Sequence, residues 1–429
     1  MKAVRRRTSP LLVSLLVLVA LTAIAAAIAW PRAEHVPSRS PAAWSATPDN
    51  IARGAYLARA GDCIACHTAR GGAAYAGGRA LDTPFGRFYG PNLTPEGTTG
   101  IGAWNADDFW NALHNGIAPG GRLLYPAFPY TNYTKVTRAD SDAMFAYFRS
   151  LPPQRQQNRP HELRFPYDRQ FMLAGWRLLY FRPNVYEEQR TRGVEWNRGA
   201  YLVEGLGHCS ACHSTRNRFG AGGDGLDGGL IATLGWYAPS LTSNAEAGLG
   251  NWEREHIVAL LGSGISPRGA ATGPMAEVVA RSLQYLTSHD LNAMALYLMS
   301  LPTTPGAPLE PGPRPAEQML AEGGRIYQAR CAACHGADGQ GRMPAYPALA
   351  GNRAVTMTPA VNAIRITVNG GFPPGTRGNP RPYGMPPFGH ELDDAQVAAV
   401  LTWIRTSWGN AAPVVTSAQV NRHRAAPVD

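Results

Sequence analysis

Three stretches of the chain carry apolar residues at the spacing of a helix face, over residues 141–150, 289–300 and 393–408. In the last stretch the apolar positions at helical intervals are Val397, Val400, Leu401 and Ile404. Asp393 precedes them and is a residue type expected to cap a helix N-terminus. Shorter helices are predicted over residues 106–115 and 253–262. The predicted fold class is therefore mainly α.

The longest hydrophobic stretch lies near the N-terminus, where an uncharged run from Leu11 to Trp30 follows a cluster of basic residues. A run of this length can span a bilayer. Basic residues before such a run are typical of a secretory signal or a membrane anchor. Ala27-Ile28-Ala29 offers a small-residue cleavage site, so residues 1–32 are expected to be a signal peptide or an uncleaved anchor. Either one would export the rest of the chain from the cytoplasm.

The sequence also repeats itself in three copies. Two copies open with the same five residues, and the third has a related segment: Arg53-Gly54-Ala55-Tyr56-Leu57, Arg198-Gly199-Ala200-Tyr201-Leu202 and Gly323-Gly324-Arg325-Ile326-Tyr327. Each segment is predicted to be helical. Three proline segments follow downstream: Pro91-Asn92-Leu93-Thr94, Pro239-Ser240-Leu241-Thr242 and Pro347-Ala348-Leu349. A chain of 429 residues corresponds to about three domains at ~150 residues each, which agrees with the three copies.

Each copy contains the motif Cys-x-x-Cys-His, and together the three motifs use every cysteine in the chain. The cysteine pairs are Cys63 and Cys66, Cys209 and Cys212, and Cys331 and Cys334, followed directly by His67, His213 and His335. This spacing is typical of c-type haem attachment, in which the cysteines form thioethers and the histidine is the proximal iron ligand. A zinc ribbon would need two cysteine pairs to converge on one metal, whereas here each pair has its own histidine. The sequence therefore predicts three haem c groups and an electron-transfer function.

A proximal histidine needs a hydrogen-bond acceptor for its second ring nitrogen, because that contact fixes the ring and tunes the iron. The three proline segments are expected to supply it through a backbone carbonyl at Pro91, Pro239 and Pro347. Proline keeps such a segment out of a helix and so leaves its carbonyls available.

A methionine as sixth ligand raises the potential of a haem relative to histidine, and the expected place for it is the loop before each closing helix. Met385 lies there in the third copy, between glycine and proline, and Met275 follows Gly273-Pro274 in the second. A methionine is otherwise often a core residue. Two methionines at matched positions favour ligation, so Met275 and Met385 are the predicted sixth ligands.

The first copy departs from this pattern, because Phe128 stands where methionine is expected and phenylalanine cannot bind iron. Met172, in the apolar segment 171–181, ranks first as its replacement, since that segment could reach back to the first haem. His114 would give a haem with two histidine ligands, and Met144 has the spacing of a core position. A first haem with no sixth ligand from this chain also stays open.

Charge and composition exclude other functions. The formal net charge is +10, and residues 1–30 supply four positive charges and no negative ones, which leaves +6 for the exported part. The propionates of three haems would offset much of this charge. No basic run interleaved with aromatic residues suggests nucleic-acid binding. No cluster of histidine, serine or carboxylate residues outside the motifs suggests a separate catalytic site.

The three motifs, the Tyr-Pro-Ala-x-Pro-Tyr loop at Tyr125, Pro274-Met275 and the ending at residues 404–410 together resemble a known family. It comprises the triheme cytochrome c subunits of periplasmic membrane-bound dehydrogenases, such as alcohol and gluconate dehydrogenases. Related subunits serve molybdenum hydroxylases of the aldehyde and N-heterocycle oxidising kind, and Phe128 favours that branch. The resemblance covers about residues 48–410. It implies an electron-transfer subunit of a dehydrogenase complex rather than the catalytic subunit.

The resemblance also implies partners and a location. A quinone-, flavin- or molybdenum-dependent catalytic subunit would donate electrons, and ubiquinone or another respiratory acceptor would receive them. The protein is expected in the periplasm, attached to the inner membrane. Two other functions stay open: a haem enzyme of the peroxidase or reductase kind, using an open first haem, and a cytochrome subunit of a terminal oxidase.

Three tandem class I cytochrome c-like domains are therefore expected after the N-terminal hydrophobic segment. The domains are predicted at residues 48–155, 191–304 and 316–410, with a connector at 156–190, a proline-rich linker at 305–315 and a tail at 411–429. The apolar segment in the connector is expected to be a helix that packs the first domain on the second. The tail is expected to be a loose strap across the surface.

Overall fold

The computed structural model describes residues 46–223, 225–242, 248–250, 252–302 and 314–424, together with Ser14 and Val17. The predicted N-terminal hydrophobic segment and most of the proline-rich linker lie outside the described residues. Among the residues described, no helix has both the length and the apolar character needed to cross a membrane. The described chain is mostly helical, as the sequence predicted, and it also contains short strands.

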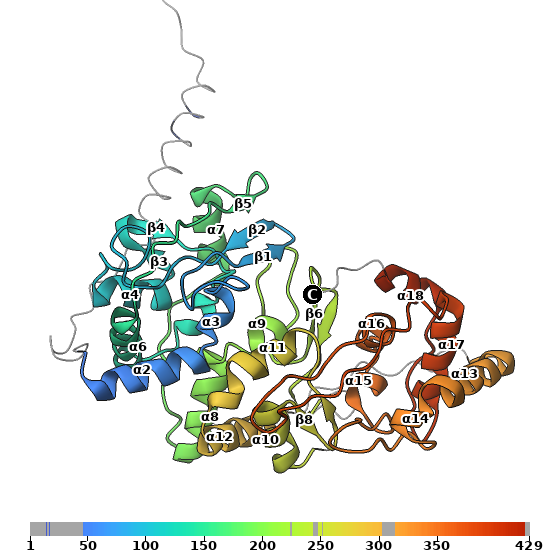
Figure 1. Ribbon diagram of the computed structural model, residues 1–429. Helices are drawn as coiled ribbons and strands as arrows, with labels where there is room; N and C mark the ends of the chain where they lie inside the picture. The colour runs from blue at the N-terminus through green and yellow to red at the C-terminus, as the bar shows by residue number, and fades with distance from the viewer. Residues whose placement is uncertain are drawn as a thin grey trace, which may run out of the picture.

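Three pairs of packed helices organise the fold, and each pair joins the start and the end of one sequence copy. The pairs are α2 (Pro48–Ala60) with α6 (Arg138–Ser150), α8 (Val194–Tyr201) with α12 (Ser288–Met299), and α13 (Glu317–Arg330) with α17 (Asp394–Thr406). We call the surrounding residues the first, second and third motif regions: 48–155, 191–302 and 314–410. Figure 1 shows them as neighbouring parts of the molecule in blue to teal, green to yellow, and orange to red.

A glycine lets the two helices of each pair approach closely. Gly54, Gly199 and Gly323 face the backbone carbonyls of Ala143, Ala293 and Ala399, and a Cβ at any of these glycines would overlap the facing oxygen. The three copies therefore share one way of packing helices. The contact also fixes the alignment of the third copy with the other two. Gly323, and not Gly324, is the structural counterpart of Gly54 and Gly199.

The closing helix of each pair begins at a side-chain cap. Thr137, Thr287 and Asp393 accept hydrogen bonds from backbone N–H groups three residues further on, at 3.3, 3.1 and 2.8 Å. Such caps satisfy N–H groups that have no partner inside the helix. The structure thus confirms Asp393 as the predicted cap.

Shorter helices complete each motif region. The first contains α3 (Cys63–Cys66), α4 (Ala106–His114), the 3-10 turn η1 (Pro119–Gly121) and α5 (Tyr130–Tyr133). The second contains the π-helix η2 (Leu202–Leu206), α9 (Ser210–His213), α10 (Arg254–Ser263), α11 (Pro274–Arg281) and the 3-10 turn η3 (Leu283–Tyr285). The third contains α14 (Ala332–His335), α15 (Arg353–Thr356) and α16 (Val361–Asn369). Helices α4 and α10 confirm the two short helices that the sequence predicted.

The strands form small antiparallel sheets at the edges of the regions. One sheet has three strands in the order β1 (Ala80–Thr83), β2 (Gly86–Tyr89) and β5 (Glu162–Leu163). The others are hairpins of β3 (Ile117–Ala118) with β4 (Arg122–Leu123), β6 (Gly229–Ile231) with β7 (Trp236–Ala238), and β8 (Ile265–Ser266) with β9 (Gly269–Ala270). The β1–β2 register places Leu81 opposite Phe88.

Apolar side chains form three large buried clusters, one in each motif region. The first two clusters exchange residues. Tyr201 and Leu206 from the second region belong to the first cluster, and Ala60 from the first region belongs to the second cluster. The third cluster is built from the third region and the C-terminal tail. The first and second regions are therefore joined by a continuous apolar contact.

The connector between the first and second regions contains a helix, as predicted. Helix α7 (Gln170–Tyr180) packs through Leu173 on Ile117 and Leu123 of the first region. Trp176 Nε1 donates a hydrogen bond to the carbonyl oxygen of Phe219 in the second region, at 2.9 Å. The helix therefore contacts both regions.

The prediction of a loose C-terminal strap is wrong for the described part of the tail. Val415 and Val420 are fully buried in the third cluster, and α18 (Ser417–Arg424) packs on α16 and α17. Arg424 Nε donates to an Asp394 carboxylate oxygen at 2.6 Å. The sequence did not indicate this packing because the tail has few apolar residues, and those few carry the contact.

Candidate haem-attachment sites

Each Cys-x-x-Cys-His motif forms a single helical turn, at α3, α9 and α14. The backbone N–H of each motif histidine donates to the carbonyl of the first cysteine, at 3.0 Å for His67, 2.9 Å for His213 and 3.0 Å for His335. Residues three and four positions apart share one face of a helical turn. Both cysteines and the histidine of each motif therefore lie on one side, and none of the six cysteines forms a disulfide.

Each motif histidine is held by a proline carbonyl, which confirms the predicted acceptors. Nδ1 lies 2.8 Å from the Pro91 oxygen in His67, 2.6 Å from the Pro239 oxygen in His213 and 2.9 Å from the Pro347 oxygen in His335. Burial lowers the pKa of all three rings, to about 4 for His213, so the rings are neutral. With the proton on Nδ1, the lone pair lies on Nε2.

A glycine that sequence reasoning missed links each histidine to its proline segment. The N–H groups of Gly77, Gly228 and Gly341 donate to the carbonyls of His67, His213 and His335, at 2.8, 2.9 and 2.8 Å. All three glycines have positive φ and pack so closely on the proline segment that a Cβ would clash with its backbone. Because the loop between histidine and glycine differs in length in each copy, no fixed spacing identifies these residues in the sequence.

The two predicted methionine ligands are half-buried, and the backbone of each is held by regular hydrogen bonds. Met275 is in the first turn of α11 and packs against the second cluster. Met385 pairs with Gly371 through two backbone hydrogen bonds, of 2.8 and 3.0 Å. Their ligation of iron stays a prediction.

In the first region Phe128 packs against the first cluster, with its ring 5.3 Å from that of Tyr133. Met144 is 1% exposed in the same cluster, which confirms the core position predicted for it. His114 is buried, lies 2.8 Å from the Thr134 carbonyl through Nδ1 and stacks on Trp110. Met172 is 40% exposed on α7, next to the buried Leu173. Iron ligation by Met172 stays a prediction. The exposed position of its side chain counts against it.

The first and second motifs approach one another through Tyr133. Its hydroxyl donates to the Gly61 carbonyl at 2.8 Å, two residues before Cys63, and lies 3.5 Å from Nδ1 of His208, the residue before Cys209. Asp62, between Gly61 and Cys63, is buried, and this burial raises the pKa of its carboxyl well above the ordinary value. Tyr133 thus contacts residues that lie just before each of the two motifs.

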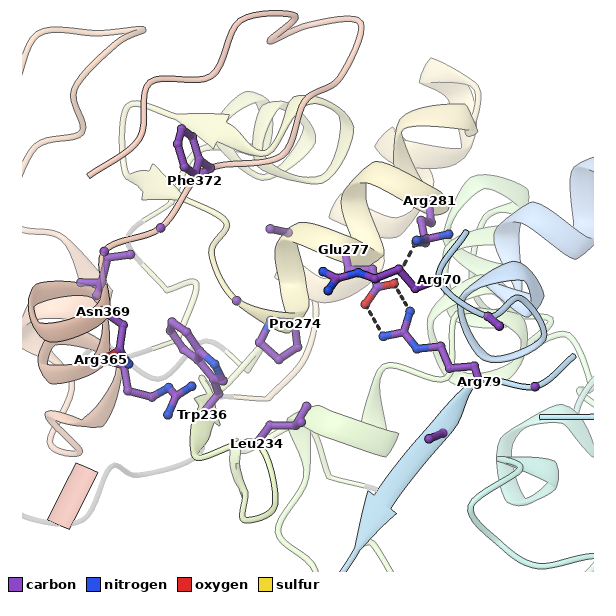
Figure 2. A pocket seen from close by; sticks show the side chains of 18 residues that line it. Arg70, Arg79, Leu234, Trp236, Pro274, Glu277, Arg281, Arg365, Asn369 and Phe372 are labelled. Carbon is purple, nitrogen blue, oxygen red and sulfur yellow. Dashed lines mark hydrogen bonds and ion pairs between the residues drawn. The ribbon is translucent and has the colours of Figure 1, made fainter. Parts of the chain in front are cut away.

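A cavity of about 730 Å³ lies where the three motif regions meet (Figure 2). Four arginines line it, Arg70, Arg79, Arg281 and Arg365, together with the single carboxylate of Glu277. Arg79 donates two hydrogen bonds to Glu277, at 2.5 and 2.8 Å, and Arg281 forms an ion pair with it at 2.8 Å. The excess of guanidinium groups makes the cavity electropositive and suited to carboxylates.

Comparisons with known proteins place this architecture in a family. The cytochrome c family model matches residues 51–152 and 320–408. The cytochrome c subunit of the quinone alcohol dehydrogenase of Gluconacetobacter polyoxogenes is 38% identical over 401 residues, covering 88% of this chain and 86% of that protein. The chain belongs to the cytochrome c subunits of dehydrogenases.

Two further relatives agree with this assignment. The gluconate 2-dehydrogenase cytochrome c subunit of Pantoea cypripedii is 37% identical to this cytochrome c subunit over 398 residues, covering 86% of this chain and 88% of the relative. A subunit of the nicotinate dehydrogenase of Pseudomonas putida is 39% identical over 395 residues, covering 90% of this chain. That match spans only 32% of the Pseudomonas protein, so this chain corresponds to about a third of it.

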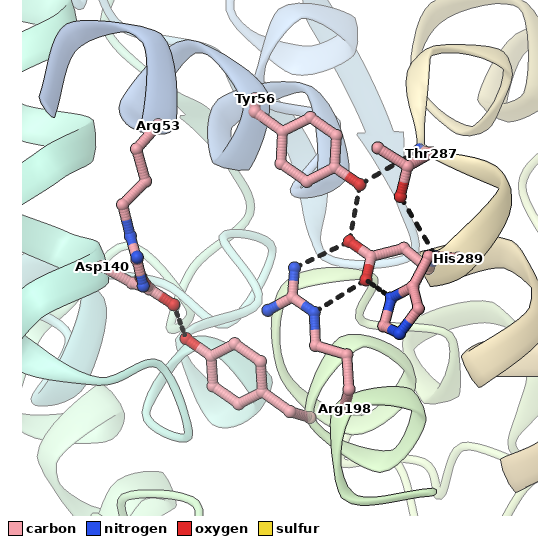
Figure 3. A network of polar contacts seen from close by, with 8 residues as sticks. Arg53, Tyr56, Asp140, Arg198, Thr287 and His289 are labelled. Atoms are coloured by element: carbon pink, nitrogen blue, oxygen red, sulfur yellow. Dashed lines mark hydrogen bonds and ion pairs between the residues drawn. The ribbon is translucent and has the colours of Figure 1, made fainter. Parts of the chain in front are cut away.

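The first and second regions of the cytochrome c subunit are joined by a reciprocal polar network (Figure 3). Arg53 forms an ion pair with Asp140 of its own region, and Arg198 does the same with Asp290. The tyrosines cross over: Tyr201 donates to Asp140 at 2.6 Å, and Tyr56 donates to Asp290 at 2.5 Å. Each tyrosine hydroxyl also accepts a backbone hydrogen bond of 3.2 Å at the cap of the other region's closing helix. The two regions are therefore related by an approximate twofold arrangement.

The third region of the cytochrome c subunit docks on the second next to its motif. Asn362 exchanges two hydrogen bonds with the backbone of Tyr237, at 2.9 and 2.7 Å. Arg353 donates to the Ser240 carbonyl at 2.7 Å, directly after the proline that holds His213. Burial lowers the pKa of Arg353 to about 10. Sequence reasoning missed both residues because each acts on the backbone of a distant region.

Proposed function

We propose that three haem c groups are attached to this cytochrome c subunit, one at each motif, in three domains with the predicted boundaries 48–155, 191–304 and 316–410. The observation that carries the proposal is the threefold recurrence of a histidine held by a proline carbonyl beside two cysteines that form no disulfide. This arrangement leaves Nε2 as the nitrogen that can bind iron. The residues present therefore fit haem c, and the arginines of the central cavity fit carboxylates such as propionates.

The bound haems would supply one-electron oxidation and reduction at iron. The proline carbonyls at residues 91, 239 and 347 orient the histidine rings and raise their basicity. Met275 and Met385 are the proposed sixth ligands in the second and third domains. For the first domain Met172 is retained as the proposed ligand, with His114 and no ligand from this chain as the alternatives.

The proposed reaction is electron transfer from the catalytic subunit of a dehydrogenase to a respiratory acceptor. The relatives support a dehydrogenase partner, because they are named as cytochrome subunits of alcohol, gluconate and fructose dehydrogenases and as a subunit of nicotinate dehydrogenase. They do not favour a haem enzyme or a terminal-oxidase subunit. The contact between the first and second motifs through Tyr133 supports electron exchange between those two sites.

Ubiquinone, or another respiratory carrier, is the proposed acceptor. A cavity of about 340 Å³ between α7 and the second motif supports this, since Trp176 and Phe181 line one side and Ser210 and Ala211, inside the motif, line the other. Small apolar acceptors bind in such partly apolar hollows. The proposed location is the periplasm at the inner membrane, with residues 1–32 as signal peptide or anchor.

Haem counting and redox titration test the proposal. Alkaline pyridine spectra of denatured, solvent-washed protein should give three covalently bound haems for each chain, and fewer would count against it. Met275→Ala and Met385→Ala should each lower the potential of one haem without loss of attachment, because each removes a thioether ligand. Met294→Leu, at a methionine that is 2% exposed in the second cluster, is the matched control and should leave all potentials unchanged. Unchanged spectra and potentials in both alanine variants would refute the ligand assignment.

A further inference from the structure

Helix α7 has one face packed on the protein and an opposite, apolar face that is exposed. Its inner face holds Leu173 and Arg177, which are 5% and 4% exposed. Its outer face consists of Phe171, Gly175, Leu178 and Leu179, all of them exposed. Leu178 and Leu179 are 65% and 74% exposed and Phe171 is 64% exposed. Apolar helix faces normally pack on another surface, so this exposed outer face indicates an interaction partner.

Neighbouring segments extend the outer face of α7 into a patch. Phe165 is 76% exposed just before the helix, and Tyr167 packs on Phe85 with ring centres 4.8 Å apart. Phe219, 47% exposed, lies beside Tyr180 at 6.3 Å. Several exposed apolar residues near one another are typical of an interaction site. Figure 1 shows α7 at the periphery of the molecule beside β2 and β5.

Basic residues surround the patch. Between residues 164 and 182 the charged residues are Arg164, Arg169, Arg177, Arg182 and Asp168. Arg177 turns inward, so the exposed charges of this segment are three arginines and Asp168, a net charge of +2, and Asp168 lies 3.4 Å from Arg169. Arg164, Arg169 and Arg182 are exposed, and Arg218 is exposed beside Phe219. Phosphate-bearing surfaces complement such an arginine rim.

We infer that the outer face of α7 inserts into the surface of an anionic phospholipid bilayer. The helix has 11 residues and is too short to span a membrane, so it lies in the plane of the interface with its outer side chains among the acyl chains. The arginine rim reaches the phosphates. The inference deepens the proposed location at the inner membrane, on which it rests, but it does not depend on residues 1–32.

A bilayer fits this face better than a protein partner does. The outer face offers no hydrogen-bonding side chain, whereas protein interfaces carry about one hydrogen bond per 100–200 Å². Arg177, the only charged residue between residues 170 and 180, turns inward onto the rings of Tyr130 and Phe181. A purely apolar face with charges confined to its rim is typical of helices that lie on membranes.

Site-directed spin labelling tests the inference on the full haem-loaded chain. Every native cysteine lies in a motif, so Leu178→Cys supplies the only thiol for a nitroxide. Leu230→Cys is the matched control, at a leucine on β6 that is 56% exposed. When vesicles of phosphatidylglycerol and phosphatidylcholine are added, oxygen access at position 178 should rise and access of an aqueous nickel chelate should fall several-fold. Neither should change at position 230. Arg169→Gln with Arg182→Gln should remove the preference for phosphatidylglycerol over phosphatidylcholine alone.

Two results would overturn the inference. One is unchanged accessibility at position 178 while the protein sediments with the vesicles. The other is low nickel access without any lipid in the complex with a dehydrogenase partner, which would mean that a protein covers the patch. If the spin label also reacts with the unsubstituted chain, at least one motif cysteine is not bound to haem through a thioether. That outcome counts against the proposed haem attachment and not against the bilayer contact.

Discussion

The first and second motif regions form a reciprocal pair, whereas the third is attached to that pair by contacts of a different kind. Tyr56 and Tyr201 cross in opposite directions and end on equivalent carboxylates. At the other junction, Asn362 and Arg353 of the third region reach backbone groups of the second. All three regions nevertheless have the same glycine-mediated helix crossing. A shared internal architecture therefore does not determine how the regions associate.

Three positions account for the difference. With Gly323 aligned to Gly54 and Gly199, the pairing arginine becomes Glu322 and the crossing tyrosine becomes Arg325. At the cap of the closing helix, Gln396 replaces the aspartate of the other two regions. Glu322 and Arg325 pair with each other on the surface, at 2.6 Å. The third region thus keeps the helix packing of the other two but lacks the side chains for a reciprocal contact.

Asp290→Ala should have the largest effect on this comparison. Asp290 is 4% exposed and accepts hydrogen bonds from Arg198 and Tyr56. Removing one partner of a buried ion pair costs about 3–5 kcal/mol. Hydrogen exchange followed by mass spectrometry should show lost protection in α2, α8 and α12, with α13 and α17 unchanged. Equal loss of protection in the third region would contradict the comparison.

The pH dependence of stability provides a second measurement on the same residue. Burial raises the pKa of Asp290, but hydrogen bonds from Arg198 and Tyr56 outweigh it and leave the pKa below its ordinary value. A carboxyl with a lowered folded-state pKa stabilises the protein above its unfolded pKa of about 4 and loses that contribution as the pH falls further. Asp290→Asn should abolish this part of the acid sensitivity of the first two regions.

Tyr201→Phe tests the reciprocity itself. It removes the hydrogen bond to Asp140 and keeps the ring in the first cluster, so we expect a loss of about 2 kcal/mol in the free energy of unfolding, as for hydrogen bonds to charged groups. Tyr56→Phe should cost nearly the same, because its contact with Asp290 is equivalent. Chemical denaturation of both variants measures the two losses. Strongly unequal losses would show that the two tyrosine contacts contribute differently to stability, although their geometry is similar.

The sequence predicted the helical fold, the closing helices, the proline carbonyls and the helix at Phe171–Phe181 because each follows from local spacing. A Cys-x-x-Cys-His turn and an amphipathic repeat are encoded over a few residues, and Asp393 as a cap is equally local. The match between copies also led correctly to the acceptors of His67, His213 and His335.

Features that depend on distant segments could not be predicted in the same way. Gly77 and its two counterparts lie at variable distances from their histidines. The crossing of Tyr56 and Tyr201 depends on how two regions associate, which one repeat does not encode. The tail was wrongly predicted to be loose because Val415 and Val420 have no periodic pattern around them. A buried contact made by an isolated apolar residue leaves no periodic pattern, so a single sequence does not predict it.

Asn362→Ala should loosen the other junction. It removes both hydrogen bonds to the backbone of Tyr237, at a cost of about 1 kcal/mol in this half-buried setting. Hydrogen exchange should increase at β7 and α16, with α2 and α6 unchanged. Asn292→Ala is a matched control, since the Asn292 side chain donates only to the Ser288 carbonyl within its own helix. Increased exchange in the first region would show that the junctions are not independent.

Arg325→Ala should have the smallest effect, although it changes the position that aligns with the two crossing tyrosines. The Arg325 side chain is 68% exposed and pairs with Glu322 three residues earlier. Exposed ion pairs of this kind contribute about 0.2–1 kcal/mol, and salt weakens them further. Chemical denaturation at low and high salt should therefore show a small loss that disappears as salt is added. A loss as large as that of Tyr201→Phe would mean that this position supports an interface in the third region too, and that the contrast between the two junctions is smaller than the side chains indicate.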